Sequence, residues 1–325
     1  MSKVILSNGI EFDCLPDQTI LEAAKNNKIS IEHSCKSGRC GICVALVLKG
    51  QSLPLRAEES ISLSDCKDGK ILTCCRTIES DVYLDIQDLG EIGNIPISTL
   101  PCRISNLEFL KKDVLLVTLR LPPSSNFKFI AGQYIELIHE GIRRSYSIAN
   151  APRQDGNIKL LIKKVNDGLM SDYLFNRAKL NDLLRIEGPQ GTFSYRENGS
   201  KNIIFIATGT GIAPIIAILE KFSLEKKQDK KFYVFWGGRY MEDIYLDLSE
   251  IKVDHHFFPA LSRDEVELSF KGYVQDAVLS SGIDLLESTV YACGSEKMIS
   301  SAATLLIKNG LSPKRLFSDA FVSSN

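Results

Sequence analysis

Residues 34–43 of the chain read SCKSGRCGIC, and they bring several cysteines into one short loop. Three of them stand at C-x4-C-x2-C spacing: Cys35, Cys40 and Cys43. Gly38 and Gly41 lie between them, and glycine permits the sharp turns that such a loop needs. A fourth cysteine is available further along, at Cys74 or Cys75. Three thiolates from one loop and a fourth from a distant segment predict a metal centre around which the amino-terminal part of the chain folds.

The spacing of these cysteines separates two kinds of metal site. C-x4-C-x2-C followed by a distant cysteine is the ligand pattern of plant-type [2Fe–2S] proteins, whereas structural zinc sites favour two short C-x2-C pairs. The sequence therefore predicts a [2Fe–2S] cluster, with a zinc site or buried free thiols as the alternative. Cys74 directly follows Leu72 and Thr73, which is where plant-type ferredoxins place their last ligand. We predict Cys74 as the fourth ligand and keep Cys75 as its alternative.

The size and charge of the chain limit its class. Its 325 residues predict two or three domains. With 39 basic and 40 acidic residues, the chain has no bulk attraction for nucleic acid or an anionic membrane. No segment approaches the ~20 consecutive apolar residues of a membrane-spanning helix, and the first residues lack the pattern of a signal peptide. Nine cysteines are an odd number for a disulfide framework, so we expect a reducing, cytoplasmic location.

Hydrophobic periodicity divides the chain into three domains of α+β and α/β type. Residues 1–90 show a hairpin, a short helix after Thr19 and further strands, which predict a mixed sheet-and-helix domain. Residues 91–100 contain Gly and Pro without hydrophobic periodicity and are predicted to form a linker. Residues 101–198 give short β-type runs between turns, which predict an antiparallel β-barrel. Residues 199–325 alternate buried strands with helices and predict a parallel α/β sheet.

A flavin-binding pattern lies in the predicted barrel. Residues 143–147 read RRSYS and contain R-x-Y-S, the signature that resembles the ferredoxin–NADP reductase superfamily. An aromatic ring such as Tyr146 can stack on an isoalloxazine, Ser147 can hydrogen-bond near the reactive nitrogen of the flavin, and Arg144 offers a fork for pyrophosphate. Four residues are a weak signal alone. Three more segments match the superfamily in the same order: AGQY at 131–134, VNDGLMS at 165–171 and GPQG at 188–191.

The second of these segments is expected to hold the FAD phosphates. Gly168 and Ser171 open a predicted helix there, and the first turn of a helix presents free amide donors and the positive end of its dipole to an anion. The resemblance implies this role for both residues.

A nicotinamide-binding pattern begins after the buried run 203–207. Three residues join that strand to a helix and allow the backbone to approach a dinucleotide pyrophosphate: Gly209, Thr210 and Gly211. Pro214 stands where the Rossmann fingerprint has its third glycine, so the loop instead resembles that of the reductase superfamily. Cys293 and Gly294 follow a strand in the C-G-x-x-x-M pattern of the superfamily, which implies that Cys293 lies near nicotinamide and flavin. A small buried residue at a strand end is the alternative.

Two further segments bear on the cofactor. Phe321 resembles the aromatic residue that covers the flavin until nicotinamide displaces it. Residues 236–239 read WGGR, and Arg239 could pair with the 2′-phosphate of NADPH. Reductases with such a segment often use NADH, so we expect NADH, with NADPH as the alternative.

The order of the motifs predicts a route for electrons. NAD(P)H delivers two electrons as a hydride, a [2Fe–2S] cluster takes one, and a flavin can exchange between them. The cluster would then serve an electron-accepting protein partner. Over its full length the chain is similar to the reductases that serve CDP-6-deoxy-4-hexulose-3-dehydrase, an enzyme of 3,6-dideoxysugar synthesis for bacterial surface polysaccharide. Four segments carry this resemblance: 71–75, 143–152, 185–193 and 317–322.

This resemblance implies a β-grasp ferredoxin domain, an FAD-binding barrel and a nicotinamide-binding α/β domain, with a sugar-nucleotide dehydrase as the electron acceptor. The same domain order also serves ring-hydroxylating oxygenases and soluble monooxygenases. A reductase component of such an oxygenase is therefore the alternative function, followed by a redox-sensing module.

Overall fold

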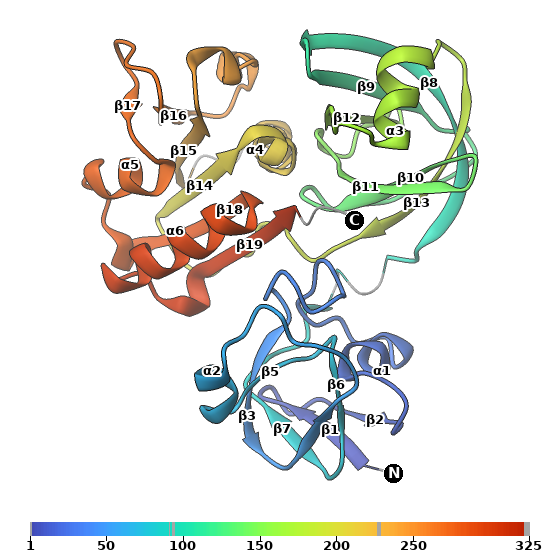
Figure 1. Ribbon diagram of the computed structural model, residues 1–325, viewed down its shortest axis with the longest axis vertical. Coiled ribbons are helices and arrows are strands. Elements are labelled where there is room, and N and C mark those ends of the chain that lie inside the picture. The colour runs from blue at the N-terminus through green and yellow to red at the C-terminus, as the bar shows by residue number, and fades with distance from the viewer. Residues whose placement is uncertain (1, 91, 93–94, 226–228, 322–325) are drawn as a thin grey trace. The chain divides into compact units, whose positions relative to one another are not determined.

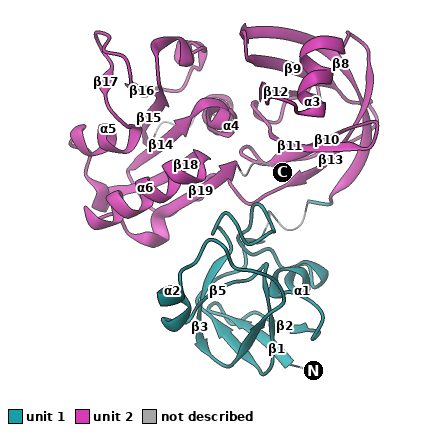
Figure 2. Ribbon diagram, viewed as in Figure 1, with its two compact units in different colours: residues 1–96, 322–325 teal, residues 97–321 magenta. Residues whose placement is uncertain are grey.

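The computed structural model describes residues 2–90, 92, 95–225 and 229–321, and the chain divides into two units at Pro96 (Figure 2). The first unit contains a five-stranded sheet of order β2-β1-β7-β3-β5 (Figure 1). Its strands have these bounds: β1 Ser2–Leu6, β2 Glu11–Cys14, β3 Val44–Lys49, β5 Lys70–Leu72 and β7 Val82–Leu84. A smaller sheet pairs β4 (Ser52–Pro54) with β6 (Arg76–Ile78).

Local sequence explains the helix that packs in this unit. Helix α1 (Ile20–Asn26) begins at a reciprocal capping box, in which Thr19 Oγ1 accepts the Glu22 amide at 3.2 Å and the Glu22 carboxylate accepts the Thr19 amide at 2.9 Å. The prediction of a helix after Thr19 is confirmed. Four of its side chains enter the core: Ile20, Leu21, Ala23 and Ala24. A second helix, α2 (Leu63–Lys67), buries none of its residues.

The second unit begins with an antiparallel sheet of order β11-β10-β13-β8-β9-β12. Its strands have these bounds: β8 Ser98–Lys111, β9 Val114–Arg120, β10 Tyr134–His139, β11 Ile142–Ser147, β12 Asn157–Lys163 and β13 Leu183–Gln190. The bridge between Ile148 and Leu160 joins the two edges of the sheet, so the sheet curls into a barrel. Between β12 and β13 lie α3 (Leu169–Asp172) and a π-helical turn, η2 (Tyr173–Arg177).

The start of β8 differs from the sequence-based expectation. Residues 98–100 were expected in the linker, but Ser98 already pairs with Gly188 of β13 and Leu100 with Ile186. The hydrogen bonds of a partner strand about 90 residues away fix this pairing, and no periodicity within the linker could indicate it.

The rest of the second unit is a parallel sheet of order β17-β16-β15-β14-β18-β19. Its strands have these bounds: β14 Asn202–Thr208, β15 Lys231–Gly238, β16 His255–Leu261, β17 Phe270–Lys271, β18 Ser288–Ser295 and β19 Leu316–Phe321. The helices are α4 (Ile212–Glu225), α5 (Val274–Ser280) and α6 (Glu296–Lys308). Single 3-10 turns complete it: η3 Gly209–Gly211, η4 Met241–Asp243, η5 Leu248–Glu250, η6 Leu285–Glu287 and η7 Pro313–Arg315.

Strand order in this sheet determines where a ligand can bind. The chain runs outward from β14 through β15 to β17, and then crosses back to place β18 on the other side of β14. In open α/β sheets, the carboxyl ends of strands at such a reversal form the ligand-binding crevice. The η3 turn follows β14 at this point. None of the helices in the described part of the chain is long and apolar enough to cross a membrane.

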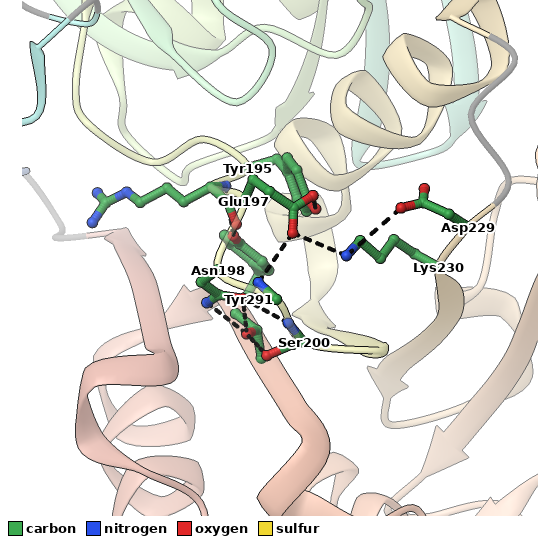
Figure 3. Close-up of polar contacts among 10 residues, drawn as sticks. Tyr195, Glu197, Asn198, Ser200, Asp229, Lys230 and Tyr291 are labelled. Atoms are coloured by element: carbon green, nitrogen blue, oxygen red, sulfur yellow. Dashed lines mark hydrogen bonds and ion pairs between the residues drawn. The ribbon is translucent and has the colours of Figure 1, made fainter.

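Residues 195–200 connect the barrel to the parallel sheet, and a polar network holds them (Figure 3). The Tyr291 hydroxyl accepts the amide of Arg196 at 2.8 Å, and Asn198 bonds the hydroxyl of Thr289. The carboxylate of Glu197 accepts the ammonium of Lys230 at 2.9 Å, as well as the hydroxyl of a neighbouring tyrosine. The connection is therefore anchored to β18, the strand that carries Cys293.

Candidate functional site

The cysteine loop of the first unit is shaped by glycine. Gly38 has φ +79°, and a Cβ there would lie 2.4 Å from the Ala57 oxygen and 2.7 Å from the Cys75 sulfur. No other residue fits that space without moving backbone. Gly41 also has a positive φ, +75°.

The four predicted ligands meet as two pairs of thiols. Cys43 Sγ lies 3.2 Å from Cys74 Sγ, and Cys35 is hydrogen-bonded to Cys40. The hydrogen bond with Cys40 holds the pKa of Cys35 below its ordinary value, and that with Cys43 does the same for Cys74. The same hydrogen bonds raise the pKa of Cys40 and of Cys43, so each pair shares a proton between its two sulfur atoms. Cys75 instead directs its thiol to the carbonyl of Ala57 at 3.3 Å.

This donor set fits a cluster with two irons, because each iron needs two thiolates. Within the described residues, no three His, Cys, Asp or Glu side chains are grouped as ligands of a single metal ion. All nine cysteines are free thiols.

In the barrel, the β10–β11 hairpin carries the R-x-Y-S residues. Alternation along β11 puts Arg144 and Tyr146 on one face, both half-buried, while Ser147 is buried at the end of the strand. Burial raises the pKa of Tyr146, so its phenol stays neutral. Helix α3 contacts β11, which brings the region of Gly168 and Ser171 to this strand. The face offers an aromatic ring, a guanidinium and a hydroxyl, which fits a flavin and its phosphates.

The α3 region corrects one part of the sequence argument. Gly168 is the N-cap, as expected, but the helix extends only over Leu169–Asp172 before the π turn. A single turn has a small dipole, so phosphate binding there would depend on individual amide donors. Ser171 is buried, and its hydroxyl accepts the amide of Val165 at 3.0 Å, which fixes the turn.

In the parallel sheet, two glycines pack the nicotinamide loop tightly against β18. A Cβ on Gly211 would lie 2.2 Å from the Cys293 oxygen, and one on Gly294 would lie 2.2 Å from Thr208 Oγ1. Gly209 has φ +55°, and its carbonyl accepts the indole N–H of Trp236 at 3.1 Å. The loop therefore packs against β18 only because these positions are glycines, since a larger residue at either one would clash with its neighbours.

Cys293 was expected after a strand, but it lies inside β18 and is fully buried. Burial raises the pKa of its thiol well above the ordinary value, so the group is neutral and packed. Phe321 ends β19 with its side chain 38% exposed. That exposure would let the ring move when a cofactor enters.

A cavity of about 900 Å³ lies at the carboxyl ends of these strands, a size suited to a nucleotide cofactor. It is lined by predicted residues: Gly209, Thr210, Arg239 and Phe321. Other wall residues were missed by sequence reasoning: Lys111, Asp113, Lys163, Asp243, Tyr273 and Gln275. The first three come from the barrel, and no motif marks them, because only the fold brings them to the sheet.

Comparison with known families agrees with the division into three functional parts. A family described as a 2Fe-2S iron-sulfur cluster binding domain matches residues 4–79, an oxidoreductase FAD-binding domain matches 101–195, and an oxidoreductase NAD-binding domain matches 205–304. The chain is 41% identical to the CDP-6-deoxy-L-threo-D-glycero-4-hexulose-3-dehydrase reductase of Yersinia pestis, over 98% of this chain and 97% of that one. The chain belongs to this reductase family, within the ferredoxin–NADP reductase superfamily.

Other similar proteins are also reductases. The reductase component of propane 2-monooxygenase from Rhodococcus jostii is 29% identical over 97% of this chain and 89% of its own. The crystal structure of the Amycolatopsis cytochrome P450 reductase GcoB matches with a TM-score of 0.74 and 26% identity, over 99% of both chains. The predicted fold class and the assignment as an oxidoreductase are confirmed. The domains of this reductase fit electron transfer from NAD(P)H through FAD to a [2Fe–2S] cluster.

Proposed function

We propose that this reductase uses NADH and passes electrons to a CDP-6-deoxy-4-hexulose-3-dehydrase in the synthesis of 3,6-dideoxyhexoses. The observation that carries this proposal is the 41% identity, along nearly the whole chain, to a reductase named for that dehydrase. We further propose domains at residues 1–90, 101–198 and 199–325 around a linker at 91–100. Nine free thiols also favour a reducing, cytoplasmic location.

The proposed cluster ligands are the two thiol pairs described above: Cys35 with Cys40, and Cys43 with Cys74. When bound, FAD supplies the exchange between the two electrons of a hydride and the single electron that a cluster accepts. The glycine-shaped loop fixes three of the ligands before the metal enters, so less conformational entropy is lost on binding.

Residues of the second unit have separate proposed roles. On the barrel, Tyr146 stacks on the flavin ring and Ser147 hydrogen-bonds near its reactive nitrogen. Arg144 binds pyrophosphate, and the remaining phosphate contacts come from Gly168 and Ser171. On the parallel sheet, the dinucleotide loop consists of Gly209, Thr210, Gly211 and Gly294. Cys293 would lie near the nicotinamide and flavin rings. Phe321 would cover the flavin, and so exclude water from it, until nicotinamide displaces the aromatic ring.

We infer a preference for NADH from the charges beside Arg239. Glu242 lines the same cavity as Arg239. Because Lys111 pairs with Asp243 at 2.6 Å, Glu242 is the carboxylate that would repel the extra charge of a 2′-phosphate. Comparing kcat/KM for the two cofactors tests this inference, with a higher value expected for NADH. A higher value for NADPH would contradict it and assign Arg239 to the 2′-phosphate.

The test of the partner is direct delivery of electrons. The purified reductase would be mixed with NADH and either a dehydrase with its sugar-nucleotide substrate or the oxygenase component of propane 2-monooxygenase. Coupled consumption of NADH and formation of the deoxysugar product are expected with the dehydrase alone. Coupling to the oxygenase but not to the dehydrase would replace the proposal with an oxygenase reductase, the function named for the relative of 29% identity.

A further inference from the structure

One ion pair joins the barrel to the wall of the dinucleotide cavity. The ammonium of Lys111, at the end of β8, lies 2.6 Å from Asp243 Oδ1, although the two residues are 132 positions apart. Both side chains are about three-quarters buried, with relative exposures of 22% and 26%. Lys111 also lies 3.3 Å from the exposed carboxylate of Glu242. The hydrogen bond to Asp243 raises the pKa of Lys111, so the ammonium stays charged.

The other oxygen of Asp243 shapes the loop after β15. Asp243 Oδ2 accepts the amides of Arg239 at 2.9 Å and Tyr240 at 3.2 Å. A Cβ on Gly238 would lie 2.8 Å from Asp243 Cβ, so the loop and the aspartate are in close contact. Because both carboxylate oxygens are occupied, Asp243 is a support for the loop that carries Arg239.

The negative charge of Asp243 explains why this residue needs Lys111 beside it. The cavity that Asp243 and Lys111 line is also lined by Gly209 and Thr210, where a pyrophosphate would approach. A partly buried carboxylate repels such an anion unless a cation compensates it, and poor screening by water strengthens the effect.

We propose that Lys111 and Asp243 are a positioning pair for the nicotinamide dinucleotide. Asp243 holds residues 238–240 in the shape that presents Arg239, and Lys111 cancels its charge from the barrel side. The inference rests on the proposed use of this cavity by the cofactor. Neither residue touches the reacting atoms.

The test measures binding of NAD⁺ to the oxidised full-length holoprotein by calorimetry. Three variants are compared with wild type: Lys111→Met, Asp243→Asn and the double variant. Lys112→Met is the matched control, because Lys112 directly follows Lys111 in the turn after β8, is exposed and is not among the residues that line the cavity. Trp236 is the only tryptophan and is bonded to Gly209, so quenching of its fluorescence gives an independent binding signal.

Loss of a charge-assisted partner predicts about tenfold weaker NAD⁺ binding by Lys111→Met, and the defect should shrink at high salt. The double variant should bind better than Lys111→Met, because it removes the uncompensated charge, and Lys112→Met should equal wild type. In turnover, KM for NADH should rise while kcat changes little.

Two results would overturn the inference while wild type binds NAD⁺. One is binding by Lys111→Met within twofold of wild type. The other is weaker binding without salt dependence and without recovery in the double variant, which would reduce the pair to a structural brace. If wild type itself does not bind NAD⁺, the proposed use of the cavity by the cofactor is wrong, and the inference, which rests on it, is wrong too.

Discussion

Replacing Cys74 and Cys75 separately by alanine tests the cluster assignment most sharply. The two cysteines are adjacent and buried, but their thiols point to different partners. Cys74 lies 3.2 Å from the sulfur of Cys43, whereas Cys75 donates to the carbonyl of Ala57. Cys74→Ala therefore removes one of the two thiolates available to one iron, and Cys75→Ala removes a packing group.

The two substitutions are expected to affect different properties: Cys75→Ala lowers stability, and Cys74→Ala lowers iron content. Cys75→Ala deletes one buried sulfur atom and leaves a small void, which costs about 1 kcal/mol. For a domain of ~100 residues this lowers Tm by roughly 4–8 °C, with the cluster retained. Cys74→Ala leaves one iron with an incomplete ligand set, so iron and sulfide content should fall nearly to zero.

The assay is iron and acid-labile sulfide per chain, together with the visible absorbance of the cluster. Flavin released from the same sample is the internal standard, because both substitutions lie in the first unit and the proposed flavin site lies in the second. Retention of a full cluster by Cys74→Ala with its loss in Cys75→Ala would refute the assignment. The sulfur atoms of Cys74 and Cys75 lie 3.6 Å apart, so intermediate iron content in both variants would mean that the two thiols exchange as ligand.

Three further substitutions, and one control, test the fold around the sites. Gly38→Ala should abolish cluster assembly because its Cβ has no space, whereas Gly9→Ala, at a positive φ with nothing within 4 Å, should cost only about 1 kcal/mol and keep the iron. Tyr291→Phe leaves the partly buried amide of Arg196 without its acceptor, and denaturant unfolding should show a loss of about 1 kcal/mol; an unchanged midpoint would contradict this. The ammonium of Lys230 lowers the pKa of Glu197 to about 2, so its stabilisation is present above pH ~4.5 and lost as pH falls towards 2. Glu197→Gln should therefore be less stable than wild type at pH 6 by under about 1 kcal/mol, with the difference shrinking as pH falls through about 2; a constant difference would exclude this linkage.

Local sequence determined the elements and motifs of this protein, because their causes act over a few residues. The capping box at Thr19 required only Glu22 three positions later, and the apolar run of β14 implied a sheet covered on both faces. Cysteine spacing and the glycines between strand and helix likewise identified three cofactor-binding regions. These signals were sufficient for the fold class.

Tertiary structure decided what depends on partners distant in the sequence. The preference for Cys74 over Cys75 rested on a one-residue alignment and stays a prediction. Only the fold shows that Cys74 Sγ lies near Cys43 Sγ while Cys75 donates to the carbonyl of Ala57. Ser98 joined a strand because β13 supplied its hydrogen bonds, and Lys111 reached Asp243 because the barrel lies against the parallel sheet within the second unit. Periodicity and spacing report which face of an element is buried. They do not report which distant side chain compensates a charge or completes a hydrogen bond, since these partners meet only when the elements pack together.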